Sequence, residues 1–326
     1  MHLLVEFTRL LVERKMKKKI NRGLFLVDRF LTKLCKTISF LITRNNNKLL
    51  INSWISFSVK GINKNNWGDD INYWLLKELS GKKIFNIADM FTSWLPKEVA
   101  NILPIGSIIE YLGNENSIIW GSGAQNGPEK IEFVPKQVLA VRGPKTREIL
   151  ISKGIQCPEV YGDPSLLLCK ICKPKTHKKY KIGIIPHYVD ALNPLITKFA
   201  ENRDSVIIIS MNKYKKWHEI PDRINECELI LSSSLHGLII SDSYNVPNVW
   251  ISFSDKIKGG MFKYLDYFAS VGRVTKAPIH INTINDFFRA NEESYKWSPI
   301  NINLKPLIES CPFSISFDKI NKKCLK

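Results

Sequence analysis

Short apolar runs typical of strands alternate with helical segments from residue 49 onward, and this alternation constrains the fold more than any other feature. A run at Leu49–Val59 precedes a helical segment, and another at Ser117–Trp120 leads into a glycine-containing loop. Such alternation is typical of parallel sheets covered by helices on both faces. A Lys-rich segment at 170–180 divides the pattern into two series. We therefore predict an α/β fold in which two Rossmann-like lobes face a cleft.

The chain has 326 residues, which is enough for two domains of ordinary size. Its seven cysteines are widely scattered, which is typical of reduced thiols in a cytoplasmic compartment. The composition predicts five segments in order: a basic amphipathic helical extension at 1–48, an N-terminal lobe at 49–169, a linker at 170–180, a C-terminal lobe at 181–280, and a tail at 281–326 that packs back on the lobes.

The first 50 residues carry +9 of the formal net charge of +18, because they hold 12 Lys and Arg against 3 Asp and Glu. Their apolar residues recur at spacings of three and four, which predicts one apolar helix face, made of Leu24, Val27, Leu31, Leu34, Ile38 and Leu41. This face fits two environments. It could lie on an anionic membrane surface, or it could pack on the protein's own core with the basic side in solvent.

Two classes of protein are disfavoured by the sequence. No run of about 18 apolar residues is present, so we expect no membrane-spanning helix. Beyond residue 50, basic and aromatic residues are not interleaved on one face, and no zinc-finger spacing occurs, so we expect no nucleic-acid partner. The loops match neither a full dinucleotide fingerprint nor a P-loop.

The loops that follow the predicted strands carry the candidate functional residues, because ligands of open α/β sheets bind at the carboxyl ends of strands. The strongest is the run from Ser232 to Gly237. The hydroxyls of Ser232, Ser233 and Ser234 and nearby N–H groups could hold a phosphate. His236 could donate to an anion or shuttle a proton. A helix N-cap run with a structural histidine remains the alternative.

Charged residues follow other strands and suit the same kind of ligand. Arg142 ends a predicted strand and could grip a carboxylate or phosphate through two N–H groups, or it could be an ordinary surface residue. Asp69 and Asp70 begin a helix, where one could act as a general base on a sugar hydroxyl or both could be caps.

Four further residues sit in loops of the same kind. Gly121 and Gly123 allow close approach of a ligand to the backbone. His187 follows a strand and is a candidate for hydrogen bonding to a substrate, since no partners for a metal site are evident. Asp163 could serve a substrate or a turn.

Six short motifs, in this order, resemble the polysaccharide pyruvyl transferase family over about residues 50–272. The motifs are Asn66-Trp67-Gly68-Asp69-Asp70, Trp120-Gly121-Ser122-Gly123, Val141-Arg142-Gly143-Pro144, Tyr161-Gly162-Asp163-Pro164, Ile184-Ile185-Pro186-His187-Tyr188 and Ser232-Ser233-Ser234-Leu235-His236-Gly237-Leu238-Ile239. The resemblance implies a fold like the two-lobed GT-B glycosyltransferases. It also implies no metal and no cofactor, with phosphoenolpyruvate as co-substrate.

The resemblance implies that the enolpyruvyl group is transferred to a sugar of a bacterial surface polysaccharide, as in exopolysaccharide or capsule assembly. A pyruvate ketal forms and phosphate is released. The acceptor would be a saccharide, free or lipid-linked. From the cysteines and the basic helix we expect a location in the cytoplasm or at the inner face of the membrane. A GT-B glycosyltransferase that uses a nucleotide sugar is the alternative, because fold does not fix function.

The resemblance also implies roles for the residues named above. His236, Asp69 and Asp70 would be catalytic, whereas Asn66, His187 and Asp163 would bind substrate. The donor would be held by the residues Arg142, Ser232, Ser233, Ser234, Gly237, Gly121, Gly123 and Lys258. Many relatives carry an Arg where this chain has Ser234, so Lys258 or Lys263 is expected to supply the missing cation.

Overall fold

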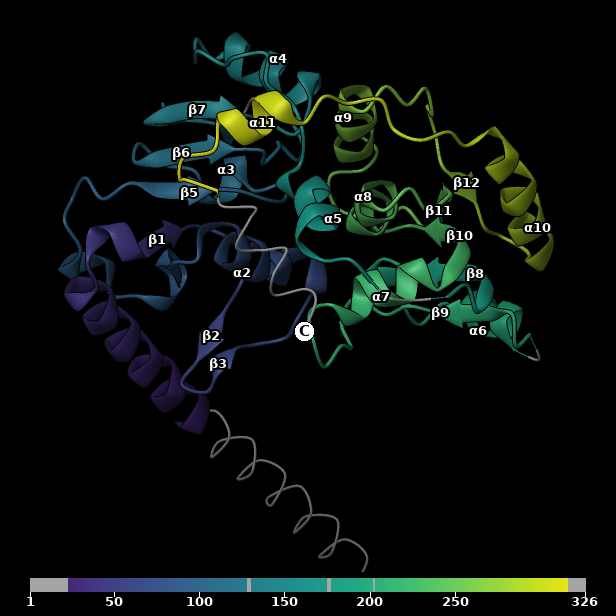
Figure 1. The fold of residues 1–326 in the computed structure, drawn as a ribbon, viewed down its shortest axis with the longest axis horizontal. Coiled ribbons are helices and arrows are strands. Elements are labelled where there is room, and N and C mark those ends of the chain that lie inside the picture. The colour runs from purple at the N-terminus through teal and green to yellow at the C-terminus, as the bar shows by residue number, and fades with distance from the viewer. Residues whose placement is uncertain (1–22, 128–129, 175–176, 202, 316–326) are drawn as a thin grey trace, which may run out of the picture.

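A computed structural model describes residues 23–127, 130–174, 177–201 and 203–315, and in this part of the chain it holds two five-stranded parallel sheets (Figure 1). The first has the order β4-β1-β5-β6-β7, with strands β1 (Lys48–Ile51), β4 (Lys83–Asn86), β5 (Asn101–Leu103), β6 (Ser117–Trp120) and β7 (Gln137–Ala140). The second has the order β12-β11-β10-β8-β9, with strands β8 (Tyr180–Ile185), β9 (Val206–Ile208), β10 (Cys227–Ser232), β11 (Asn248–Ser252) and β12 (Ile279–His280). Two parallel sheets with interspersed helices confirm the predicted α/β, Rossmann-like fold.

Helices connect the parallel strands, and a small antiparallel hairpin interrupts the first series. The hairpin consists of β2 (Phe57–Ser58) and β3 (Gly61–Ile62). The helices are α2 (Trp67–Ser80), α3 (Ile109–Leu112), α4 (Pro144–Ser152), α5 (Leu168–Ile171), α6 (Pro194–Ala200), α7 (Glu219–Asn225), α8 (Leu235–Ser243), α9 (Phe262–Ser270), α10 (Ile284–Glu293) and α11 (Lys305–Glu309). Parallel strands need such crossovers, and these place helices on the faces of each sheet.

The first lobe departs from the sequence-based prediction at its strands. The predicted strand Leu49–Val59 ends as β1 at Ile51, and only residues 57–58 of its second half form a strand, in the hairpin. The short strands β4 and β5 were missed, because three or four residues are too few to show a period. The predicted linker begins within α5, whose Ile171 is buried.

The apolar spacing from Ile71 to Leu79 predicts a helix that begins at Ile71, but α2 begins four residues earlier, at Trp67, because Asn66 caps it. The Asn66 side chain accepts a hydrogen bond from the N–H of Gly68 at 3.2 Å. Trp67, in the first turn, is fully buried and donates its Nε1–H to the carbonyl of Trp217, a residue of the second series. Asp69 and Asp70 therefore stand on the first turn of α2, in agreement with the prediction that they begin a helix.

The chain returns to the first lobe at its C-terminal end. After α10, whose Phe287 stacks on Phe199 with ring centroids 4.2 Å apart, α11 lies beside β6 and β7 (Figure 1). The Nε1–H of Trp120 donates to the carbonyl of Leu307 at 3.0 Å, and the ring of Phe313 lies 5.7 Å from that of Trp120. These contacts tie the C-terminal segment to the first sheet.

The N-terminal helix, described over 23–42, does not pack its predicted apolar face on the rest of the protein. Its predicted apolar face is turned outward, with Leu24 63% and Val27 56% exposed. The polar side meets the protein, where Arg29 pairs with Asp89 at 2.6 Å and Lys36 lies over the Phe57 ring. The alternative in which this apolar stripe packs on the protein's own core is therefore wrong. Residues 1–22 of the predicted extension lie outside the described residues.

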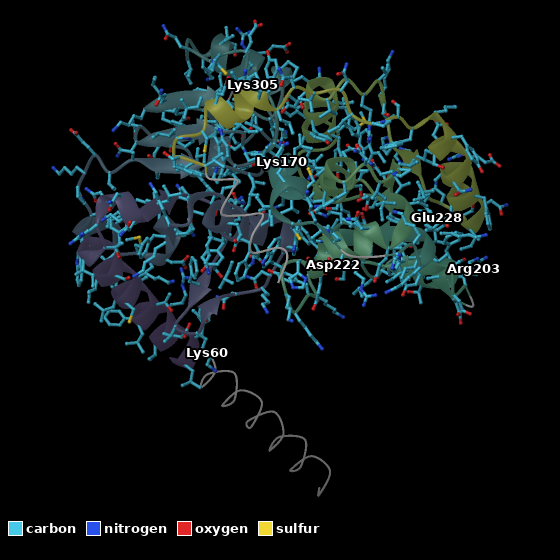
Figure 2. All side chains as sticks on the ribbon, viewed as in Figure 1. Lys60, Lys170, Arg203, Asp222, Glu228 and Lys305 are labelled. Carbon is cyan, nitrogen blue, oxygen red and sulfur yellow. The ribbon has the colours of Figure 1, made fainter. Side chains whose placement is uncertain are left out.

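No helix within the described ranges is long and apolar enough to cross a bilayer. Many charged side chains lie at the periphery, as Lys60, Glu228 and Lys305 do (Figure 2). Arg142 and Asp266 are exceptions, since both are fully buried. Burying two charged side chains costs free energy unless hydrogen bonds and the opposite charge compensate for the lost water. The partners of Arg142 and Asp266 are therefore described with the site below.

Candidate active site

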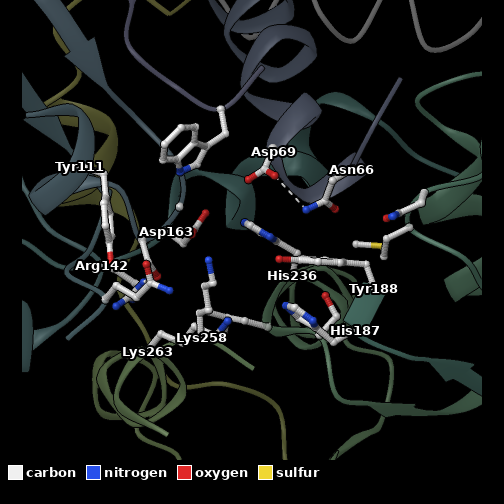
Figure 3. Close-up of a pocket in the computed structure, with 18 of the residues that line it drawn as sticks. Asn66, Asp69, Tyr111, Arg142, Asp163, His187, Tyr188, His236, Lys258 and Lys263 are labelled. Carbon is white, nitrogen blue, oxygen red and sulfur yellow. Dashed lines mark hydrogen bonds between the residues drawn. The ribbon is translucent and has the colours of Figure 1, made fainter. Parts of the chain in front are cut away.

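A cavity of about 480 Å³ is lined by residues from both lobes (Figure 3). The first lobe contributes the predicted residues Asn66, Asp69, Arg142 and Asp163, and the second contributes His187, Ser234, His236, Lys258 and Lys263. Several of them directly follow strands, as Arg142 follows β7 and His187 follows β8. Parallel strands bring such residues to one edge of each sheet, and here the two edges share one cavity.

The other predicted residues do not line this cavity. Ser232 donates its hydroxyl to the carbonyls of Ile185 and Ser234, while the Oγ of Ser233 accepts the N–H of His187. These serines shape the turn that leads into α8. A Cβ on Gly123 would lie 2.3 Å from Cζ of Arg142, so this glycine makes room for the guanidinium. Gly121 lies close to Pro164 and Gly237 lies close to Ser232, so these glycines also make room for other residues of the protein.

Arg142 is held by the protein on several sides. Its Nε–H donates to Asp266 at 2.9 Å, and its other nitrogens donate to the Ser107 hydroxyl at 2.6 Å and the Ala124 carbonyl at 2.7 Å. Asp266, on α9, also accepts from the backbone N–H and the hydroxyl of Thr146 at 2.9 and 2.7 Å. Arg142 therefore joins the two lobes, and it borders the cavity with most of its donors already used.

Sequence reasoning missed Asp266. The residue lies in the middle of α9, among the aromatic and aliphatic side chains of Phe262–Ser270. An acidic residue inside an apolar helical segment is the one signal that could have pointed to it, since a carboxylate is buried only with partners. Its partner, Arg142, is 124 residues away in the chain.

His236 packs against the first turn of α2. A Cβ on Gly68 would lie 2.3 Å from Nδ1 of His236, so only glycine leaves room for the ring at this position. The Nε2 atom is buried and has no hydrogen-bond partner within the described residues. Burial, then the charges of Lys263 and Arg142, lower the pKa of His236 to about 3. The imidazole is therefore neutral near pH 7, and its Nε2 can take part in a hydrogen bond with a ligand.

The two aspartates of the predicted pair have separate environments. Asp69 lines the cavity and accepts a hydrogen bond from Nδ2 of Asn66 at 2.9 Å. Burial and the charge of Asp70 raise the pKa of Asp69 to about 6. Asp70 points away and accepts from the Tyr214 hydroxyl at 2.7 Å. Asp69 is thus the carboxylate that can reach a substrate, and its pKa suits a base near neutral pH.

Two lysines, Lys258 and Lys263, bring positive charge to the cavity. Figure 3 shows Lys258 and Lys263 on the side of the cavity where Arg142 lies, away from Asn66. Lys263 makes no hydrogen bond or ion pair with any residue that the structure describes, and its ammonium lies 5.4 Å from the Tyr264 ring centroid. Burial, followed by the charge of Arg142, lowers the pKa of Lys263 to about 8. Such a cation is available to an anionic ligand.

The remaining predicted residues contribute polar groups to the wall. Asp163 is buried and accepts both the N–H and the hydroxyl of Ser165. Burial, then the charge of Lys263, lowers the pKa of His187 to about 4, so this ring is also neutral. Within the described ranges, no group of three or more His, Cys, Asp or Glu side chains could hold a metal ion.

Replacing Asp69 with asparagine is expected to raise the unfolding temperature at pH 7.5. The pKa of Asp69 is raised from 3.8 to about 6 in the folded protein, so ionisation destabilises the fold as the pH rises through this window. The carboxamide oxygen of the new side chain would still accept the hydrogen bond from Asn66. Thermal unfolding should show a smaller gain at pH 5 than at pH 7.5. An equal gain at both values, or none, would contradict the assigned environment.

Comparisons with known proteins agree with the motifs. Residues 108–255 match the family model described as Polysaccharide pyruvyl transferase. The chain is 31% identical over 173 residues to Uncharacterized protein L143 of Acanthamoeba polyphaga mimivirus, which covers 52% of this chain and 59% of that protein. It is 28% identical over 167 residues to Succinoglycan biosynthesis protein ExoV of Rhizobium meliloti, which covers 50% of each.

The chain thus spans about half the length of the curated relatives it matches. The family model covers the residues that follow β5, including Arg142, His187 and His236 of the cavity. The match contains five of the six motifs, from Trp120 onward, and confirms the resemblance there. Over residues 108–255 the chain is similar to the polysaccharide pyruvyl transferase family.

Proposed function

We propose that the protein transfers the enolpyruvyl group of phosphoenolpyruvate to a sugar of a polysaccharide, forming a pyruvate ketal and releasing phosphate. One observation carries the proposal. A single cavity holds Lys258 and Lys263, which make no hydrogen bond or ion pair with the residues that the structure describes, together with Asp69, a carboxylate whose pKa is raised to about 6. The name of one relative, a succinoglycan biosynthesis protein, supports a polysaccharide acceptor. The arrangement of the two sheets supports a GT-B-like fold.

The donor carries a phosphate and a carboxylate, so its site needs several cations or N–H donors. Lys263 and Lys258 meet this need, and they supply the cation that relatives place at the position of Ser234. Helix α8 begins beside Ser234 and directs its N-terminal dipole at the same region. His236, through a ring nitrogen, would donate to the bound anion. Its pKa would rise on binding, because a dianion offsets the lysine charges that now lower it.

The reaction begins when the methylene carbon of phosphoenolpyruvate takes up a proton and an oxocarbenium ion forms. One sugar hydroxyl attacks C2, the carbon that bears the phosphate oxygen, and loses a proton, which balances the proton taken up by the methylene carbon. A second hydroxyl then attacks C2 and closes the ketal ring, while phosphate leaves with the electrons of the C–O bond and the proton of this second hydroxyl ends on the phosphate. Asp69 would accept a hydroxyl proton, and Lys263 and His236 would stabilise the charge on the phosphate.

The function is tested by following phosphorus NMR of phosphoenolpyruvate with the protein and hexose disaccharides or polysaccharide fragments as acceptors. We expect the donor signal to be replaced by inorganic phosphate, and Asp69→Asn to abolish the change. Nucleotide release from a nucleotide sugar, with no phosphate from phosphoenolpyruvate, would instead support the alternative of a GT-B glycosyltransferase.

We further propose that the acceptor is lipid-linked and that the N-terminal helix rests on the cytoplasmic face of an anionic membrane. The outward face of this helix includes Phe25, Phe30 and Ile42, exposed by 61%, 57% and 78%. The sequence just before it holds the basic run Arg14–Lys19. An apolar helix face beside basic residues matches the chemistry of an anionic lipid surface.

The double variant Leu31→Glu, Ile38→Glu is expected to lower binding to phosphatidylserine-containing vesicles at least tenfold. Burial of each aliphatic side chain contributes about 1.5–3 kcal/mol, and both contributions would be lost. Co-sedimentation of the full chain measures the bound fraction. Leu192→Glu is the matched control, because Leu192 is 96% exposed on the second lobe. Equal binding of the double variant and the wild type would refute membrane binding through this helix face. Binding that needs no anionic lipid would refute the proposed role of the basic residues.

A further inference from the structure

Two aromatic side chains at the cavity are left open to solvent. Trp54, in the loop after β1, is 53% exposed, and Tyr111, on α3, is 42% exposed. Both line the cavity that holds Asp69, and their ring centroids lie 6.4 Å apart at an interplanar angle of 51°. We call Trp54 and Tyr111 the aromatic pair. Large exposed aromatic rings beside a polar cavity are unfavourable in water unless something covers them.

The aromatic pair is held in place by contacts that involve its neighbours in the chain. Asn52, two residues before Trp54, donates its side-chain N–H to the carbonyl of Leu112 at 2.6 Å, which joins the two segments. The Asn126 side chain donates to the Tyr111 hydroxyl at 3.2 Å. The Lys130 ammonium lies 5.3 Å from the Tyr111 ring centroid. The rings are therefore exposed although their segments are ordered.

A second set of bonds fixes the loop beside Tyr111. One carboxylate oxygen of Glu110 accepts the backbone N–H groups of Gln125 and Asn126 at 2.6 and 3.0 Å. Gln125 itself lines the cavity. The loop that bears Asn126 is thereby tied to the helix that bears Tyr111. This network gives the aromatic pair a fixed position, as expected of a preformed binding surface.

We propose that the aromatic pair is the acceptor subsite, where a sugar ring of the saccharide rests its C–H face on Trp54 and Tyr111. This inference rests on the proposed function. The donor of that reaction is a small dianion and gains little from aromatic rings. A pyranose has one face of C–H groups and a rim of hydroxyls, so it suits a surface that is apolar at its centre and polar at its edge. Asn66 and Asp69 supply polar groups in the same cavity.

The position of the aromatic pair assigns it a role in specificity. Figure 3 shows Tyr111 beside Arg142, on the side of the cavity where Lys258 and Lys263 lie, so a sugar on the aromatic pair would lie next to the donor, as group transfer requires. Because uncharged rings add little to the binding of a dianion, the aromatic pair would set which saccharides bind and leave the affinity for phosphoenolpyruvate unchanged. Loss of Trp54 should therefore act on the KM for the acceptor and spare donor binding.

Saturation-transfer NMR of maltose, lactose and cellobiose at millimolar concentration tests the aromatic pair directly. We expect at least one disaccharide to receive saturation from the full chain, most strongly at its ring C–H protons. Trp54→Ala should remove the signal, and Trp54→Phe should restore most of it. Trp94→Ala is the control, because Trp94 is 52% exposed but does not line the cavity.

The outcomes separate this inference from the proposed function. Loss of the saccharide signal in Trp54→Ala with phosphoenolpyruvate binding retained supports both. A saccharide signal that needs Trp54, in a protein that binds no phosphoenolpyruvate, supports the subsite and refutes the donor. No transfer to any disaccharide, or transfer that survives Trp54→Ala, overturns the acceptor subsite.

Discussion

Replacing Asp266 with alanine is expected to lower the free energy of unfolding by about 3–5 kcal/mol, the range for breaking a buried ion pair. The change would leave the guanidinium of Arg142 buried without its counter-charge, and the N–H of Thr146 would lose its acceptor. Both lobes meet at this carboxylate, so the loss should also loosen their contact. Urea unfolding followed by circular dichroism measures the effect.

Asp222→Ala provides the matched control for this experiment. Its side chain is 33% exposed and pairs with His218 at 2.8 Å, and such a solvent-accessible ion pair contributes at most about 1 kcal/mol. Arg142→Ala should destabilise the protein to an extent similar to Asp266→Ala, so a loss of ligand binding in that variant would not by itself identify a donor contact. A change below about 1 kcal/mol in Asp266→Ala would contradict the proposed role of the pair.

Replacing Gly68 with alanine is expected to lower kcat/KM for pyruvyl transfer by about 100-fold, the effect of misplacing a reacting group by about 1 Å. The new methyl group would lie 2.3 Å from Nδ1 of His236, closer than van der Waals contact allows, so the ring must move. The same shift would disturb the first turn of α2, which bears Asp69. Steady-state phosphate release measures the loss.

The control for this variant is Gly127→Ala, because a Cβ there meets no atom within 4 Å. Near-ultraviolet circular dichroism should show that the aromatic packing of Gly68→Ala is retained, so that the loss reflects the site and not unfolding. Full activity of Gly68→Ala would mean that the position of His236 does not matter to the reaction.

Much of the fold could be predicted from the apolar residues, because their spacing along the chain differs between helices and strands. The prediction failed where an element is too short to show a period, as for β4 and β5. It also failed where capping overrides apolar spacing, as when Asn66 starts α2 before Ile71. The surroundings of the N-terminal helix could not be predicted, because the spacing of apolar residues shows that an apolar face exists but not whether that face contacts the protein or its environment.

The candidate site was predicted in part for a similar reason. Loops at strand ends share one edge of a parallel sheet, so the rule that ligands bind there selected Arg142, His187 and His236, which line one cavity. Contacts between lobes cannot be read from one sequence. The pairing of Arg142 with Asp266 and the approach of His236 to Gly68 join segments more than 100 residues apart.

Calorimetric titration of phosphoenolpyruvate into the wild type and Lys263→Met tests whether the cavity binds this donor and whether Lys263 contributes to the binding. Methionine keeps the apolar stem of the lysine and removes only its charge, so the fold should be preserved, and circular dichroism checks this. We expect saturable binding to the wild type, at least tenfold weaker binding to Lys263→Met, and no change for the surface variant Lys60→Met. Failure of the wild type to bind phosphoenolpyruvate, or equal affinity in Lys263→Met, would contradict the proposed donor site.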